Sequence, residues 1–126
     1  NMNNPIRIHR VSFRHAFDGI IHNFKTQPNF RFHFFAAFLA TAAGLFFRVN
    51  FIEWMVLFFT FNMVIVAEMV NTTVEAIVDL ITQERRQDAK VAKDVSAGMV
   101  LIAAIFAIVI GLYIFVPKII VFITNQ

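Results

Sequence analysis

Three carboxylates recur at helical spacing directly after a long apolar stretch. At about 100° per residue, Glu68, Glu75 and Asp79 lie, with Thr72, within roughly 60° of one another on a helix surface. The segment that precedes them, 54–67, contains no charged residue. A carboxylate near hydrocarbon is unfavourable, by roughly 2.5–3.5 kcal/mol at a membrane centre. Acids placed there need neighbouring cations or a catalytic task.

Phosphoryl transfer is a task that suits this spacing. It requires a base for the attacking hydroxyl, a divalent cation on the phosphates, and basic groups that hold them. Glu68, at the membrane end of the stripe, would be the base for a lipid hydroxyl. Glu75 lies about 10 Å further along the axis, within reach of Mg²⁺ on a nucleotide. Asn71, between the two, can orient either group by hydrogen bonding.

A basic segment follows the acids. Lys93 offers an ammonium for a phosphate, and Asp94 offers a carboxylate that can hold the lysine or a ribose. The stretch Glu84, Arg85 and Arg86 adds further nucleotide contacts. The four glycines are too dispersed for either glycine-rich phosphate loop. We therefore expect side chains, rather than a backbone cradle, to bind ATP.

The composition indicates a small integral membrane protein. Of 126 residues, 59% are hydrophobic and only 15% are charged, which is too apolar for a soluble domain of this size. The absence of cysteine excludes disulfides and thiolate metal sites. The net charge of +3 is concentrated locally, which favours membrane anchoring over nucleic-acid binding.

We predict a single all-α domain over residues 1–126, with an amphipathic surface helix and three membrane helices. The surface helix covers 6–26, and the spans cover 29–48, 52–82 and 94–116. Pro28 breaks the first junction, residues 83–93 form a polar connection, and Pro117 with Lys118 marks the end of the third span. Ala36, Ala37, Ala40, Ala43 and Gly44 give the first span a stripe for close helix contact.

Basic residues predict the orientation. They gather before the first span and in the second connection, which places both on the cytoplasmic side of the cell membrane. The basic residues concerned are Arg7, Arg10, Arg14, Lys25, Arg31, Arg85, Arg86, Lys90 and Lys93. The acidic face would then meet the cytoplasmic interface, where a soluble nucleotide can reach a lipid headgroup.

Segments 68–79 (EMVNTTVEAIVD) and 92–98 (AKDVSAG) resemble the signature of the bacterial diacylglycerol kinase and undecaprenol kinase family. The similarity covers roughly residues 12–118. Segments 12–17, 29–33, 43–45 and 52–54 look closer to the undecaprenol kinase branch. The resemblance implies a homotrimer of three-span subunits, each with an N-terminal surface helix, and active sites built across subunits.

The resemblance also implies residue roles. Glu68 would be the general base, Glu75 a Mg–ATP ligand, and Asn71 a polar partner. The implied nucleotide contacts are Lys93, Asp94, Glu84, Arg85 and Arg86, with Arg10, Arg14 and His15 near nucleotide or lipid headgroup.

One position departs from the family pattern. A second Mg²⁺-binding acid usually precedes the first span, and Gln27 stands there in this chain. Its amide oxygen is a weaker ligand for a hard cation. Metal binding would then depend more on Glu75 and the phosphates, or on help from Asn29, or activity would be reduced.

Four functions follow from these residues. The favoured one is ATP- and Mg²⁺-dependent phosphorylation of a membrane lipid alcohol, undecaprenol before diacylglycerol. Diacylglycerol phosphorylation to phosphatidic acid is the alternative within the class. A non-catalytic scaffold or ion pathway is the alternative of another class, because intramembrane acids also line cation routes. A nucleotide sensor that has lost catalysis is the fourth, suggested by Gln27.

Overall fold

The computed structural model describes the backbone of residues 5–126 and the side chains of residues 12–126. Four helices make up this part of the chain: α1 (Pro5–Thr26), α2 (Pro28–Phe46), α3 (Phe51–Ile81) and α4 (Gln87–Thr124). The described residues contain no strand. The expectation of an all-helical fold is thus confirmed.

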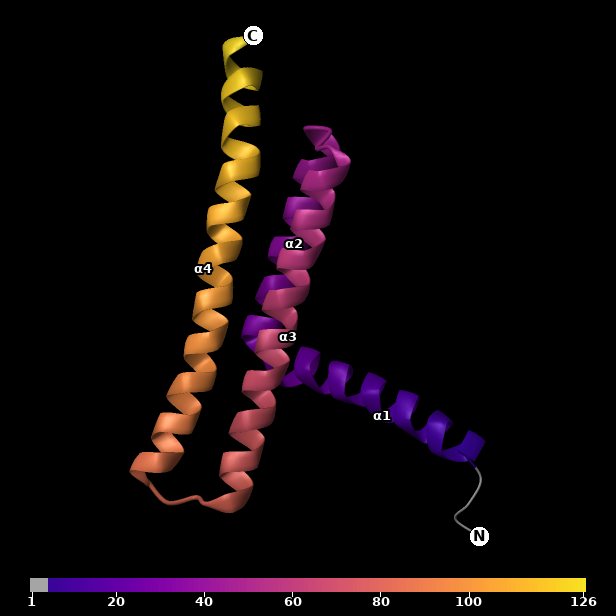
Figure 1. Ribbon diagram of the computed structural model, residues 1–126, viewed down its shortest axis with the longest axis vertical. Coiled ribbons are helices and arrows are strands. Elements are labelled where there is room, and N and C mark those ends of the chain that lie inside the picture. Colours follow the sequence, from indigo (N-terminus) through magenta and orange to yellow (C-terminus); the bar gives the residue numbers. More distant parts are fainter. Residues whose placement is uncertain (1–4) are drawn as a thin grey trace.

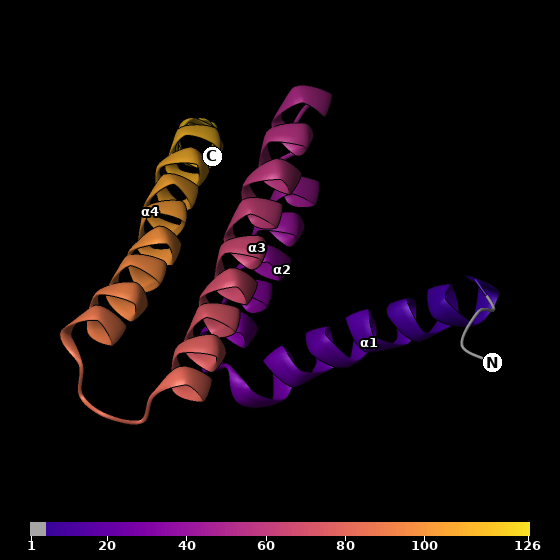
Figure 2. The same ribbon diagram turned by 60° about the horizontal axis from the view of Figure 1, so that its bottom comes forward.

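Helices α2, α3 and α4 run side by side, and α3 contacts both of the others (Figures 1 and 2). Helix α1 leaves this bundle obliquely from the start of α2 (Figure 1). The connection between α3 and α4 lies at the same end of the bundle as the α1–α2 junction (Figure 1). This end carries the polar residues singled out by the sequence.

Two helices, α3 and α4, are long and apolar enough within the described part of the chain to cross a membrane. Helix α2 has 19 residues and is long enough, but Asn29, Arg31 and His33 lower its mean hydropathy, so it is not among them. The third span therefore stays a prediction. The many exposed apolar side chains on α2, including Phe35 and Phe38, support it.

The junction between α1 and α2 is held by Arg31. Its guanidinium donates to the carbonyl oxygens of Phe24, at 2.6 Å, and Lys25, at 3.2 Å. These are last-turn carbonyls of α1 that lack helical partners. Pro28 occupies the first turn of α2, where its missing N–H costs nothing. The surface helix is thus tied to the base of the bundle.

Phenylalanine rings fill the space beside this junction. Phe30 is fully buried and packs against Phe24 and Phe34, with ring centroids 4.8 and 5.0 Å apart. Phe34 in turn contacts Phe61 of α3 at 5.1 Å. This cluster connects α1, α2 and α3, and Phe61 lies about two helical turns before Glu68 on α3.

Helix α4 is longer than the predicted third span at both ends. It begins at Gln87 instead of Asp94, so the polar connection is shorter than 83–93, and Asp88 instead of Asp94 is the first-turn acid. Polarity alone did not indicate a loop here, because exposed polar residues also form helix. An i,i+4 ion pair, Lys90 to Asp94, supports this first stretch.

The far end of α4 also departs from the prediction. The helix continues through Pro117 to Thr124 and projects beyond the ends of α2 and α3 (Figure 1). A proline inside a helix removes one backbone hydrogen bond without ending it. The Lys118 ammonium lies 3.0 Å from the Glu53 carboxylate, so its charge does not force an end. Glu53 itself completes the capping box with Asn50 that starts α3.

Candidate active site

The Glu68 carboxyl is the most buried charged group among the described side chains. Only 2% of the residue is exposed, and its Oε2 atom has no hydrogen-bond partner in the described protein. The side-chain amide of Asn29, at the start of α2, lies near this carboxyl. Glu75 is close enough for the two carboxylates to repel each other. A buried oxygen without a partner is unusual in proteins and is free to accept a proton or hydrogen bond from a substrate.

Asn71 connects this acid face to α4. It is 9% exposed, and its Nδ2 donates to Glu75 Oε1 at 3.2 Å. Its Oδ1 accepts from the Ser96 hydroxyl at 2.7 Å. Ser96 is 6% exposed and belongs to α4. The predicted base and the predicted metal ligand therefore flank an amide that a second helix holds.

Lys93 and Asp94 have different partners from those expected. The Lys93 ammonium lies 2.6 Å from Asp79 Oδ1 on α3, while Asp94 pairs with Lys90 on its own helix. Asp94 therefore does not hold the lysine. The two residues also lie inside α4, about two turns from its start, and not at the helix beginning. Asp79, which could have been only a solvated acid, positions Lys93 instead.

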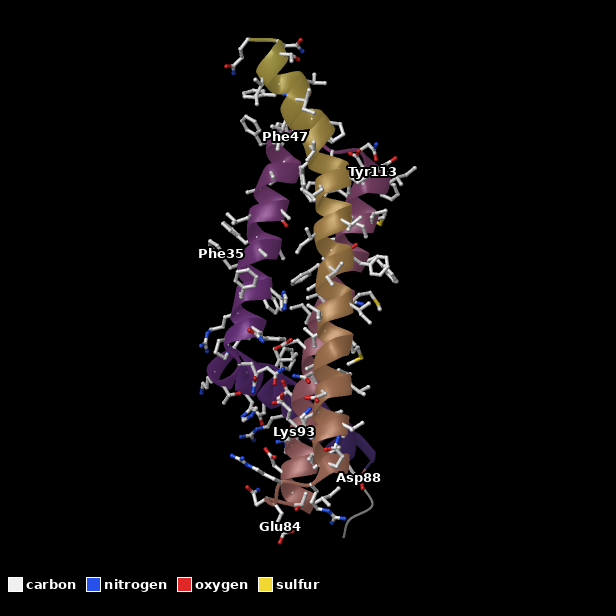
Figure 3. The ribbon with its side chains drawn as sticks, turned by 90° about the vertical axis from the view of Figure 1, so that its left-hand side faces the viewer. Phe35, Phe47, Glu84, Asp88, Lys93 and Tyr113 are labelled. Atoms are coloured by element: carbon white, nitrogen blue, oxygen red, sulfur yellow. The ribbon has the colours of Figure 1, made fainter. Side chains whose placement is uncertain are left out.

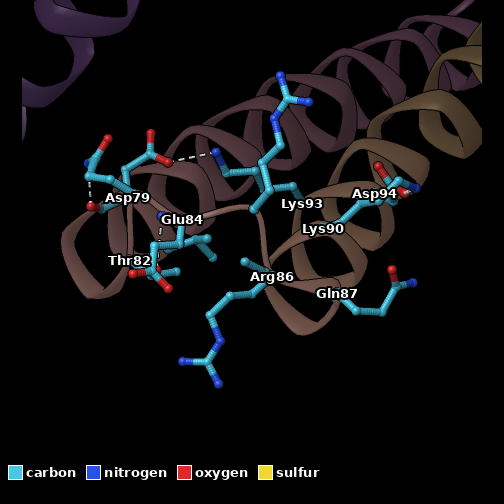
Figure 4. A pocket seen from close by; sticks show the side chains of 12 residues that line it. Asp79, Thr82, Glu84, Arg86, Gln87, Lys90, Lys93 and Asp94 are labelled. Atoms are coloured by element: carbon cyan, nitrogen blue, oxygen red, sulfur yellow. Dashed lines mark hydrogen bonds and ion pairs between the residues drawn. The ribbon is translucent and has the colours of Figure 1, made fainter.

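A pocket of about 610 Å³ opens at the connection between α3 and α4 (Figure 4). Its lining includes five of the predicted nucleotide contacts: Glu84, Arg85, Arg86, Lys93 and Asp94. Figure 3 shows Glu84 and Lys93 at this end of the bundle, remote from Phe47 and Tyr113 at the other. The basic side chains around the pocket can bind phosphates, so the structure groups these five predicted residues.

Other predicted residues lie on or next to α1. Arg14 and His15 are exposed, and His15 Nδ1 lies 3.9 Å from Asp18. The side chain of Arg10 lies outside the described residues. Gln27 stands between α1 and α2, where its amide nitrogen lies 3.4 Å from the Thr26 hydroxyl. The described contacts do not join these side chains to Glu68 or Glu75.

The donor set is compatible with Mg²⁺ that arrives on a nucleotide. Among the described side chains, no group of three or more acids or histidines surrounds one point. Mg²⁺ commonly binds one or two carboxylates together with substrate phosphates, keeping several waters. Glu75 supplies a half-buried carboxylate with one oxygen oriented by Asn71. The residues thus fit a shared metal–nucleotide site rather than a closed protein cage.

The sequence did not reveal the positions of two residues near the site. Ser96 was given no role, and Asn29 was considered only as possible help for a metal. Ser96 falls one helical turn after Lys93, on the side of α4 that faces α3. That spacing is the signal that could have placed it beside Asn71.

Comparison with known proteins decides the family. The pattern of the prokaryotic diacylglycerol kinase family matches residues 14–115. The chain belongs to this family. Undecaprenol kinase of Bacillus subtilis is 41% identical over 107 residues, which cover 85% of this chain and 87% of that protein. Diacylglycerol kinase of Synechocystis sp. is 41% identical over 102 residues, which cover 80% of this chain and 58% of that protein.

Family membership makes this chain a lipid kinase of the membrane, with ATP as co-substrate. The match includes Glu68, Asn71, Glu75, Lys93 and Asp94, and it excludes Arg10. The resemblance read from the motifs at 68–79 and 92–98 is confirmed.

Proposed function

We propose that this protein transfers the γ-phosphoryl group of Mg–ATP to the hydroxyl of undecaprenol and produces undecaprenyl phosphate. The observation that carries the proposal is the buried Glu68 carboxyl with one unpartnered oxygen, next to the Asn71–Glu75 pair. Similarity to undecaprenol kinase over most of both chains supports this substrate.

The reaction assigns one task to each group. Glu68 accepts the proton of the lipid hydroxyl as its oxygen attacks the γ-phosphorus. The bond from that phosphorus to the oxygen of the β-phosphate breaks, and ADP leaves. Lys93 and the arginines of the connection bind phosphates, and Glu75 would hold Mg²⁺. The metal, when bound, neutralises charge on the phosphates.

An apolar groove supports a lipid substrate with a long hydrocarbon part. It has a volume of about 410 Å³ and is lined by residues of α2, α3 and α4. One of them, Val64, lies one helical turn before Glu68. A hydroxyl beside Glu68 would thus leave its hydrocarbon chain next to an apolar surface.

Replacing Glu68 by Gln tests the base. The amide keeps the shape but cannot take a proton, so we expect kcat to fall by about 10² or more. The assay measures radiolabel transferred from ATP to extracted lipid. Glu53→Gln is the matched control, since it changes an acid of the same helix at the opposite end and should keep kcat. Near-normal turnover of Glu68→Gln would contradict the base assignment.

Diacylglycerol is the second candidate substrate, supported by the Synechocystis relative. Undecaprenol and diacylglycerol offered side by side, with product analysis, separate the two. Higher kcat/KM for undecaprenol is expected. Nucleotide binding without any labelled lipid would favour a sensor. If the protein neither binds nucleotide nor labels lipid, a scaffold or ion pathway is favoured.

The homotrimer is part of the proposal. Its support is the family to which the chain belongs. Chemical cross-linking and native mass spectrometry of the protein in detergent should both give three subunits. A monomer or a dimer would contradict the homotrimer.

A further inference from the structure

The Ser96 hydroxyl, which no part of the proposed mechanism uses, is buried between α3 and α4. It lies 2.7 Å from Asn71 Oδ1 and 2.9 Å from the carbonyl oxygen of Lys93. A hydroxyl has one hydrogen to donate. The Lys93 carbonyl, inside α4, already accepts a helical backbone bond. Asn71 Oδ1 has no other donor among the described residues, so the hydrogen belongs there.

The chemistry of the neighbours fixes which way the Asn71 amide faces. An ionised carboxylate only accepts hydrogen bonds, so the atom of Asn71 that faces Glu75 must be the NH₂ group. The carbonyl oxygen of the amide then necessarily faces α4, where it needs a donor. Ser96 supplies that donor. The oxygen and nitrogen of an amide are nearly the same size, so the hydrogen-bond partners decide which atom faces which helix.

We propose that Ser96 is a positioning residue for the metal–nucleotide site. It holds the Asn71 amide so that its NH₂ group orients one oxygen of Glu75, and it does not touch substrate itself. This inference rests on one part of the proposed function, which is that Glu75 binds the metal. Hydrogen bonds behind a ligating carboxylate commonly contribute 10- to 100-fold to metal affinity.

Removal of the hydroxyl should affect metal affinity more than turnover. In Ser96→Ala, the buried Asn71 oxygen loses its donor, and the amide is free to rotate away from Glu75. We expect about 10-fold weaker binding of Mn²⁺, used as a spectroscopic probe with a non-hydrolysable ATP analogue. The KM for Mg–ATP should rise by a similar factor, while kcat changes less. Ser96→Thr, which keeps the hydroxyl, should restore most of the affinity.

A double-mutant cycle tests whether Ser96 acts through Asn71. Mn²⁺ affinity is measured for Ser96→Ala, Asn71→Ala and the double variant by electron paramagnetic resonance. If the inference is right, Ser96→Ala has no further effect once Asn71 is alanine. Thr73→Ala is the matched control, because Thr73 is exposed and its hydroxyl bonds, among the described residues, only to the Met69 carbonyl of its own helix. Wild-type affinity in Ser96→Ala, or an equal loss in both backgrounds, would overturn the inference.

A measurement without ligand separates this inference from the kinase assignment. The side-chain NH₂ resonance of Asn71 in the ligand-free protein should shift in Ser96→Ala and exchange faster with water, but not in Thr73→Ala. That shift supports the positioning role even if no lipid is phosphorylated. An unchanged resonance refutes it even if the wild type is an active kinase.

Discussion

At the scale of single residues, the site combines a buried acid with an acid that is half-exposed. Glu68 has almost no access to water, whereas Glu75 lies about two turns nearer to the polar end of α3. Two carboxylates in such different surroundings can perform different tasks: one takes a proton and the other binds a cation. Asn71 lies between them and bonds to Glu75.

Gln27 offers a test of the metal site. Gln27→Glu restores the acid that the family pattern usually has, and a carboxylate is a better ligand for Mg²⁺ than an amide. We expect the Mg²⁺ concentration for half-maximal activity to fall by about 10-fold. A magnesium titration of lipid phosphorylation measures it, with Gln126→Glu as a control for added charge. An unchanged titration would show that position 27 does not bind the metal.

The sequence predicted these residues unevenly. The placement of Glu68, Asn71 and Glu75 on one face of a helix was predictable from their spacing, while their roles stay predictions. The pairing of Lys93 with Asp79 was not, because Asp94 is its neighbour in the chain and contact across two helices depends on their relative rotation. Ser96 was missed for the same reason, since its spacing from Lys93 places it beside Asn71 only once the pairing of α3 with α4 is known.

At the scale of elements, one close helix contact positions α2 against α3. Gly44 is buried, and a Cβ atom there would lie 2.6 Å from Cη2 of Trp54. The other small residues of the α2 stripe are more exposed, and Ala36 and Ala43 line the apolar groove. The predicted stripe thus makes close contact with α3 at its Gly44 end.

Gly44→Ala should therefore destabilise the bundle. The added methyl forces the Trp54 ring to move, and overpacking of this kind costs about 1–3 kcal/mol. Thermal unfolding in detergent measures the loss. Gly111→Ala is the matched control, because no atom lies within 4 Å of its added Cβ, and it should be neutral or slightly stabilising. Equal stability of the two variants would contradict the close contact.

The presence of each helix was predictable from the sequence, but the length of α4 was not. The surface helix and the helix carrying the acids lie within about one residue of their predicted bounds. The length of α4 was underestimated because a proline and a charged residue usually mark the end of a helix. Here Glu53 neutralises Lys118 across the bundle, and the helix continues. Such compensation comes from a helix more than 60 residues earlier in the chain, beyond the reach of local patterns.

At the scale of the whole molecule, the number of membrane crossings determines whether all predicted nucleotide contacts lie on the same side of the membrane. If α2 crosses, α1 and the α3–α4 connection share one side, as the basic residues predict. The predicted nucleotide contacts on both would then face the same compartment.

Single cysteines can test this arrangement, because the natural chain has none. Ser12→Cys and Gln83→Cys should react with an impermeant maleimide only from the cytoplasmic side, and Gln126→Cys only from the other side. Cell-surface labelling of intact cells, compared with labelling of inverted vesicles, measures it. Opposite sidedness of positions 12 and 83 would show that α2 does not cross.

The overhang of α4 has a consequence for the environment of the enzyme. After its two polar first turns, residues 95–124 extend about 45 Å, about one and a half times the thickness of a hydrocarbon core of about 30 Å. Apolar side chains such as Ile120 and Ile123 are exposed along the overhang. In a thin bilayer this hydrophobic mismatch favours tilting of α4, and the same rigid rod carries Lys93 and Ser96 at its other end. Acyl-chain length of the surrounding phospholipids would thus tune nucleotide affinity from the opposite leaflet.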